Sequence, residues 1–72
     1  MEWIELNKNR LPEKEVLAAN FLPGTHGYKE KLLGYLHLAK NQDSKKYIVC
    51  ESEYEVLLNC THYIDINSFD LN

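Results

Sequence analysis

Eleven residues near the C-terminus alternate between apolar and polar side chains: Val56-Leu57-Leu58-Asn59-Cys60-Thr61-His62-Tyr63-Ile64-Asp65-Ile66. Successive side chains of a β-strand point to opposite faces of the sheet, so every second residue shares a face. One face is almost wholly apolar and consists of Val56, Leu58, Cys60, His62, Ile64 and Ile66. The other face is mostly polar. This period-two pattern predicts a half-buried strand, which we expect to be the central strand of the fold.

Weaker strand signals precede this stretch. Residues 3–6 form a short apolar segment that suits an edge strand, and residues 47–51 are rich in β-branched and aromatic side chains. A polar segment, residues 52–55, leads from 47–51 into the predicted central strand. We therefore expect these two strands to pair as a hairpin.

Two segments, 13–22 and 28–40, are compatible with either a helix or a strand. In 28–40 a strand would place Leu33, Tyr35, His37 and Ala39 opposite a face of Leu32, Gly34, Leu36 and Leu38. Glycine in the middle of a helix costs about 1 kcal/mol relative to alanine, which favours the strand. The sequence thus predicts a mostly β fold, a small antiparallel sheet of about four strands. The alternative is an α+β fold with one short helix at 13–22 or 28–40.

The length of 72 residues allows one small domain, residues 1–72. Such a short chain buries little surface, so its stability margin is small. Dense packing of its aromatic residues or formation of a homo-oligomer would increase that margin.

The formal net charge is −3, from 11 acidic and 8 basic residues. Nucleic-acid binding requires a basic surface that neutralises phosphates, and the sequence shows none. We therefore expect no nucleic-acid partner. Glu51, Glu53 and Glu55 form an acidic cluster that suits either a solvated hairpin end or a charged contact for a basic partner.

Cysteine content and hydropathy bear on the compartment. Two cysteines are too few for a disulfide framework, and no segment has the apolar run of a signal peptide or a membrane span. The sequence therefore predicts a cytoplasmic protein with reduced thiols and no membrane contact.

One set of residues has the chemistry of a metal site. Cys50, Cys60 and His62, with His37 as a fourth ligand, would suit tetrahedral zinc. However, the set lacks the closely spaced ligand pairs of structural zinc sites, so we expect no metal and no cofactor. Cys60 and His62 also lack the surrounding motifs of a nucleophilic pair, and we expect no enzymatic activity.

Several short motifs occur in an order that resembles a known family. The motifs are Trp3-Ile4, Leu11-Pro12, Val16-Leu17, Gly34-Tyr35 and Thr61-His62-Tyr63-Ile64. They resemble a small phage- and prophage-associated bacterial domain family of unknown function, whose signature runs Trp-Ile, Leu-Pro, Val-Leu, Gly-Tyr and Thr-His-Trp-Met. Tyr63 stands where the family has Trp, and the proline that follows the family's last motif is absent. The resemblance implies a strand-rich domain and makes Thr61-His62 a signature position.

These observations predict a non-enzymatic protein-interaction module, encoded by a phage or prophage, that binds an unknown protein partner. The alternative is a small zinc-binding domain that uses Cys50, Cys60 and His62. The candidate binding residues are Trp3, Thr61, His62 and Tyr63.

Overall fold

The fold is one β-sheet that bends into two halves, and the longest strand, β3 (Lys31–Lys40), pairs with strands of both halves. The computed structural model describes residues 2–66. The first part of β3 pairs with β2, and its second part, from Tyr35 onward, pairs with β4. The other strands are β1 (Ile4–Glu5), β2 (Val16–Ala19), β4 (Lys46–Glu51), β5 (Val56–Leu57) and β6 (His62–Asp65).

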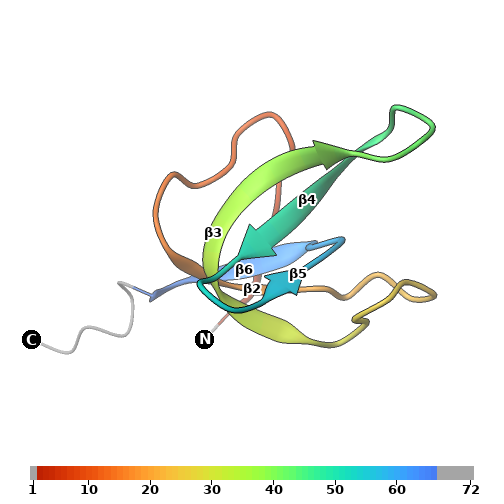
Figure 1. Cartoon of the computed structure of the whole chain (residues 1–72). Helices are drawn as coiled ribbons and strands as arrows, with labels where there is room; N and C mark the ends of the chain where they lie inside the picture. Colours follow the sequence, from red (N-terminus) through yellow and green to blue (C-terminus); the bar gives the residue numbers. More distant parts are fainter. Residues whose placement is uncertain (1, 67–72) are drawn as a thin grey trace, which may run out of the picture.

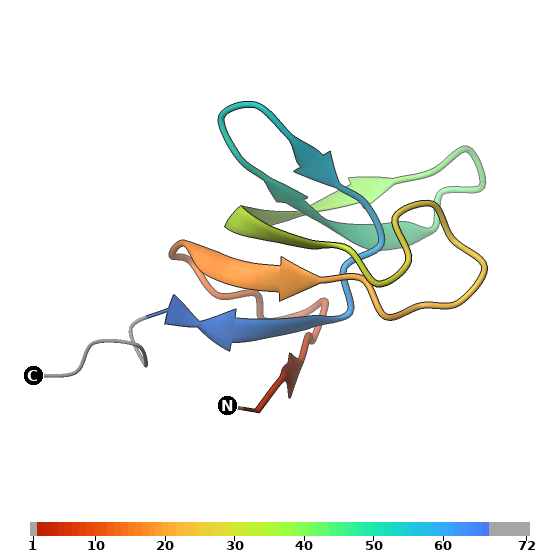
Figure 2. The same ribbon diagram turned by 90° about the horizontal axis from the view of Figure 1, so that it is seen from below.

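The six strands form one antiparallel sheet in the order β1-β6-β2-β3-β4-β5. Figure 2 shows its two halves, with β4 and β5 above β2 and β6, and with β3 joining them. The predicted mostly β, antiparallel fold is therefore confirmed, with six strands in place of about four.

The curvature of β3, visible in Figure 1, depends on a close approach of two backbones at Gly34. Gly34 is buried, and a Cβ atom at this position would lie 2.4 Å from the carbonyl oxygen of Glu51. Only a residue without a side chain lets β3 pass so near the end of β4. The glycine therefore permits one strand to serve both halves.

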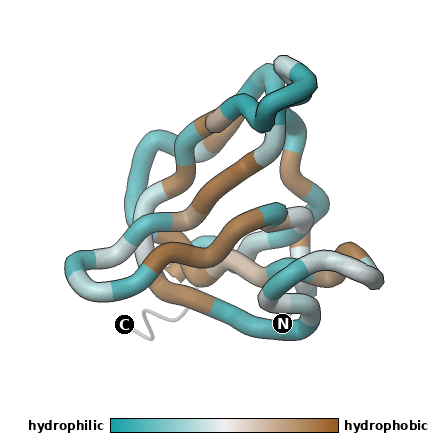
Figure 3. Tube along the Cα trace, turned by 45° about the vertical axis from the view of Figure 1, so that its right-hand side comes forward, coloured by the Kyte–Doolittle hydropathy of each residue, from teal (hydrophilic) through white to brown (hydrophobic). Residues whose placement is uncertain are grey.

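The core lies between the two halves. Its central cluster is Ala18, Ile48, Cys50, Leu57 and Cys60. Four partly buried side chains pack against this cluster: Leu6, Leu11, Leu32 and Leu36. Figure 3 shows that hydrophobic residues are concentrated in the strands and hydrophilic residues in the turns.

Both ambiguous segments are strands. Residues 13–22 contain β2, and residues 28–40 contain β3, so neither segment forms the helix of the α+β alternative. The face of β3 that carries Leu32 and Leu36 packs on the core.

The prediction of one continuous central strand at residues 56–66 was wrong. The chain turns at Asn59, which adopts a positive φ of 59°. The residues before the turn form β5 at one edge of the sheet, paired with β4 as the predicted hairpin. The residues after it form β6, which lies between β1 and β2. The left-handed conformation of Asn59 thus separates the alternating sequence into two strands that lie in different parts of the sheet.

The link between β5 and β6 ties the halves of the sheet together. The Cys60 N–H donates to the carbonyl oxygen of Ile48 in β4 at 2.8 Å, and the Thr61 N–H donates to that of Ala19 in β2 at 2.9 Å. Two consecutive residues therefore hydrogen-bond to strands of both halves.

Asn20 holds the loop between β2 and β3. It is completely buried, and its Nδ2 donates to Thr25 Oγ1 at 3.0 Å and to the His26 carbonyl oxygen at 3.1 Å. Its Oδ1 accepts the Leu22 N–H at 2.9 Å. Because buried polar groups need hydrogen-bond partners, this residue fixes the path of the loop.

Replacement of Gly34 tests the close approach. Alanine normally stabilises a strand by about 0.5–1 kcal/mol relative to glycine. Here the new methyl group would overlap the Glu51 carbonyl, so we expect Gly34→Ala to lower the free energy of unfolding by about 1–3 kcal/mol, measured by urea denaturation. Stability equal to or above that of the unmodified chain would contradict this explanation of the bend.

Candidate functional site

One face of the β6-β2-β3 half lies opposite the central core cluster, although two of its residues, Ala19 and Ile64, are also buried. Ala18 belongs to the core cluster, so its neighbours Leu17 and Ala19 point to the opposite side. Directly paired residues of antiparallel strands share a face. We call this surface the outer face. By the strand register it consists of three rows of paired residues: Glu5, Ala19, Lys31 and His62; Leu17, Leu33 and Ile64; and Tyr35 with Glu51.

The middle of the outer face is apolar. Leu17 pairs with Leu33 on one side and with Ile64 on the other. Ile64 is buried and Leu17 is half-buried, whereas the side chain of Leu33 is 45% exposed and that of Tyr35 is 58% exposed. Two large apolar side chains on one strand therefore remain in contact with solvent.

An aromatic cluster borders this apolar centre. The rings of Trp3 and Phe21 meet edge to face, with centroids 5.2 Å apart. The His62 ring lies 5.2 Å from Phe21 in a tilted arrangement, and Lys31 Nζ lies 5.7 Å from the Phe21 centroid. The face of an aromatic ring carries partial negative charge, so it attracts both the edge of another ring and a nearby ammonium group.

Thr61 connects Phe21 to His62. Its Oγ1 accepts the Phe21 N–H at 3.0 Å and lies 2.7 Å from His62 Nδ1. A threonine hydroxyl can accept one hydrogen bond and donate its own proton at the same time. Thr61 therefore orients both the Phe21 backbone and the His62 ring.

The structure brings three of the four predicted binding residues together. Trp3, Thr61 and His62 all belong to the cluster around Phe21. Tyr63 does not, because it pairs with Ile4 and Ala18 and lies on the opposite face of the sheet. Tyr63 is therefore separated from the other three candidate binding residues by the sheet.

The sequence reasoning missed Phe21, Leu33 and Tyr35 as surface residues of interest. The available signal was the apolar character of both faces of residues 28–40. A strand with apolar side chains on both faces is buried on both sides or exposes an apolar surface. In β3 one of the two faces exposes an apolar surface, since Leu33 and Tyr35 are exposed.

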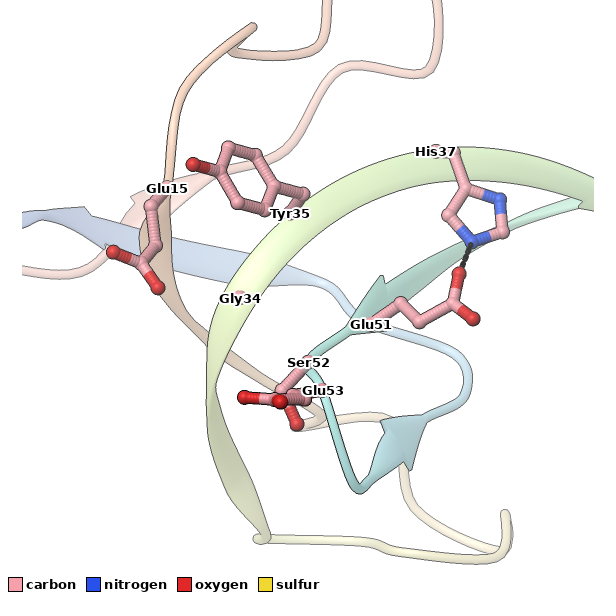
Figure 4. Close-up of a pocket in the computed structure, with 7 residues that line it drawn as sticks. All are labelled: Glu15, Gly34, Tyr35, His37, Glu51, Ser52 and Glu53. Atoms are coloured by element: carbon pink, nitrogen blue, oxygen red, sulfur yellow. Dashed lines mark hydrogen bonds and ion pairs between the residues drawn. The ribbon is translucent and has the colours of Figure 1, made fainter.

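A pocket lies beside the outer face, where β3 passes the end of β4 (Figure 4). Its volume is about 440 Å³, and it is lined by Glu15, Gly34, Tyr35, His37, Glu51, Ser52 and Glu53. The three glutamates come from three segments: the loop before β2, the end of β4 and the β4–β5 turn. His37 Nε2 lies 3.1 Å from Glu51 Oε1. Within residues 2–66, neither Glu15 nor Glu53 forms an ion pair.

The predicted acidic cluster is divided by a turn. The Ser52 N–H donates to the Glu55 carbonyl oxygen at 2.9 Å, and the Glu55 N–H donates to Ser52 Oγ at 3.0 Å. Glu51 and Glu53 line the pocket, whereas Glu55 is exposed outside it. The three residues therefore do not form one row along a strand.

Both cysteines are buried free thiols in the core. Burial raises the pKa of Cys50 to about 11, and the negative charge of Glu15 adds to the effect. Burial likewise raises the pKa of Cys60 to about 12, with a smaller contribution from Cys50. Since the thiolate is the nucleophile and the metal ligand, neither side chain has the character of a reactive cysteine.

The proposed zinc ligands do not converge. Cys50 and Cys60 lie in the core, whereas His62 packs on Phe21 on the outer face and His37 contacts Glu51. In residues 2–66, no group of three His, Cys, Asp or Glu side chains is placed to hold a metal ion. The same separation removes the basis for a Cys60–His62 nucleophilic pair.

Comparisons with protein-family models, with curated proteins and with solved structures gave no match. No helix in residues 2–66 has the length and apolar character required to cross a bilayer. Functional inference therefore depends on the outer face and the adjacent pocket.

Thr61 is expected to contribute to stability through its hydroxyl group. Thr61→Val keeps the shape but leaves the Phe21 N–H without its acceptor, so we expect a loss of about 1–2 kcal/mol in unfolding free energy. Thr61→Ser retains the hydroxyl and should lose less. Urea denaturation followed by Trp3 fluorescence measures both variants, and equal losses would show that the hydroxyl is not the cause.

The raised thiol pKa values predict a loss of stability above pH 9. The unfolded chain ionises its thiols near 9.0, whereas the folded chain holds their protons up to about 11 and 12, so rising pH favours unfolding. Each thiol contributes up to about 1.4 kcal/mol per pH unit. Urea denaturation between pH 8 and 10.5 measures this slope. A Cys50→Ala/Cys60→Ala control should have a shallower slope, and identical slopes would contradict the prediction.

Proposed function

We propose that this chain is a non-enzymatic protein-interaction module that binds another protein through the outer face. The observation that carries the proposal is the exposure of Leu33 and Tyr35 beside Leu17 on a regular sheet surface. Strand pairing fixes the positions of these side chains, so little conformational freedom of the backbone is lost on binding.

The expected contribution of this surface to affinity is substantial. Burial of a leucine or aromatic side chain contributes about 1.5–3 kcal/mol when it is completely removed from water. Leu33 and Tyr35 are each about half exposed, so a partner that covers them would gain part of this burial free energy. Tyrosine also adds a hydroxyl group for hydrogen bonding at an interface.

The buried thiols support a role without catalysis. Cys50 and Cys60 have raised pKa values and are not among the residues that line the pocket. Reduced cysteines are also usual in the cytoplasm, which supports cytoplasmic action. The ordered motifs shared with the phage-associated family favour a phage or prophage origin, so phage and host proteins are the first partners to examine.

Photo-crosslinking in the cells that make the protein tests the proposal. We expect a benzoylphenylalanine residue in place of Tyr35 to crosslink one defined protein, identified by mass spectrometry. The matched control carries the same residue in place of Tyr54, which is 88% exposed on the β4–β5 turn, and should not crosslink that protein. No product, equal products from both positions, or a crosslinked dimer of this chain would contradict the proposal.

Competition by unlabelled variants defines the surface. We expect Leu33→Ser to compete about tenfold less well than the unmodified chain, which corresponds to about 1.4 kcal/mol. Leu38→Ser is the matched control, because Leu38 lies on the same strand with its side chain 37% exposed and points to the opposite face. Equal competition by the two variants would exclude the outer face as the binding surface.

A further inference from the structure

We propose that the pocket beside the outer face holds the guanidinium group of an arginine from the partner protein, while a neighbouring apolar side chain of the same segment packs on Leu33. This inference rests on the proposed function and specifies the chemistry of the partner. The partner segment therefore contains an apolar residue and an arginine two positions apart.

Acidic side chains outnumber basic ones in the lining of the pocket. Three carboxylates, from Glu15, Glu51 and Glu53, are among the described residues that line the pocket, and no lysine or arginine is. His37 offsets Glu51 only when it is protonated. Carboxylates lower the energy of a nearby cation, so this lining favours a positively charged group.

The residues that line the pocket suit an arginine side chain. No group of three acidic, histidine or cysteine side chains within residues 2–66 is placed to hold a metal ion. A guanidinium group is planar, donates to carboxylates through several N–H groups and stacks on aromatic rings. Tyr35, which is exposed and lines the same pocket, supplies such a ring.

Register places the two halves of this surface at a defined spacing. Leu33 and Tyr35 lie two residues apart on β3 and share its outer side. Strand geometry separates such positions by about 6.6 Å, which is also the spacing of alternate residues in an extended peptide. An extended segment that follows β3 would thus place an apolar residue over Leu33 and an arginine two positions away in the pocket.

A short synthetic peptide tests this chemistry on the whole protein. The probe is acetyl-Gly-Leu-Ser-Arg-Gly-amide, and its control contains citrulline, which is neutral and nearly isosteric, in place of arginine. We expect the arginine peptide to shift the backbone NMR signals of Gly34, Tyr35 and Ser52 in a saturable manner. The citrulline peptide should bind at least tenfold more weakly, and added salt should weaken only the arginine peptide.

Substitutions with equal charge change locate the bound arginine. We expect Glu15→Gln and Glu53→Gln each to weaken binding of the arginine peptide about tenfold. Glu13→Gln and Glu55→Gln are the matched controls, since these residues lie in the same two segments, are exposed and do not line the pocket. The controls should bind the peptide as the unmodified chain does.

The outcomes separate this inference from the proposed function. Equal binding of both peptides, or equal effects of pocket and control substitutions, would overturn the arginine assignment. So would the absence of any shift at the pocket. In each of these cases a partner crosslinked through position 35 would still support the proposed function. A crosslinked product that is a second copy of this chain would overturn both.

Discussion

The contact between Gly34 and the Glu51 carbonyl is the constraint on which the sheet depends. A Cβ at position 34 would lie 2.4 Å from that oxygen, so the strands can approach only because the residue is glycine. The approach lets β3 pair with β2 in its first part and with β4 in its second. It also creates the pocket, because the residues that line it include Gly34, its neighbour Tyr35 and the end of β4. Fold and candidate site therefore share one steric cause.

The second organising element is the short link between β5 and β6. Asn59 reverses the expected alternation through its positive φ, and Cys60 and Thr61 then hydrogen-bond to β4 and β2. Thr61 also accepts the Phe21 N–H and contacts His62. The same link thus holds the two halves of the sheet and orients the aromatic cluster on the outer face.

The sequence was sufficient to predict a mostly β fold, because period-two alternation follows directly from strand geometry. It was not sufficient for residues 56–66, since asparagine is compatible with both an extended and a left-handed conformation, and only tertiary hydrogen bonds select the latter. For the site, the sequence singled out Trp3, Thr61 and His62 one by one, and only the fold shows that they lie together around Phe21. The pocket was not predictable, because Glu15 and Glu53 are distant in sequence and line the same pocket only once the sheet has folded.

The position of β6 has a consequence for biosynthesis. This strand (His62–Asp65) lies between β1 and β2, although it is the last of the six strands to be translated. Until these residues leave the ribosome, β1 has no neighbour in the sheet and Phe21 lacks both the Thr61 hydroxyl and the His62 ring. The hairpin of β3 and β4 can form earlier, because its contacts are local in sequence. The outer face therefore acquires its final form only after β6 has left the ribosome, so an incomplete nascent chain lacks the complete outer face.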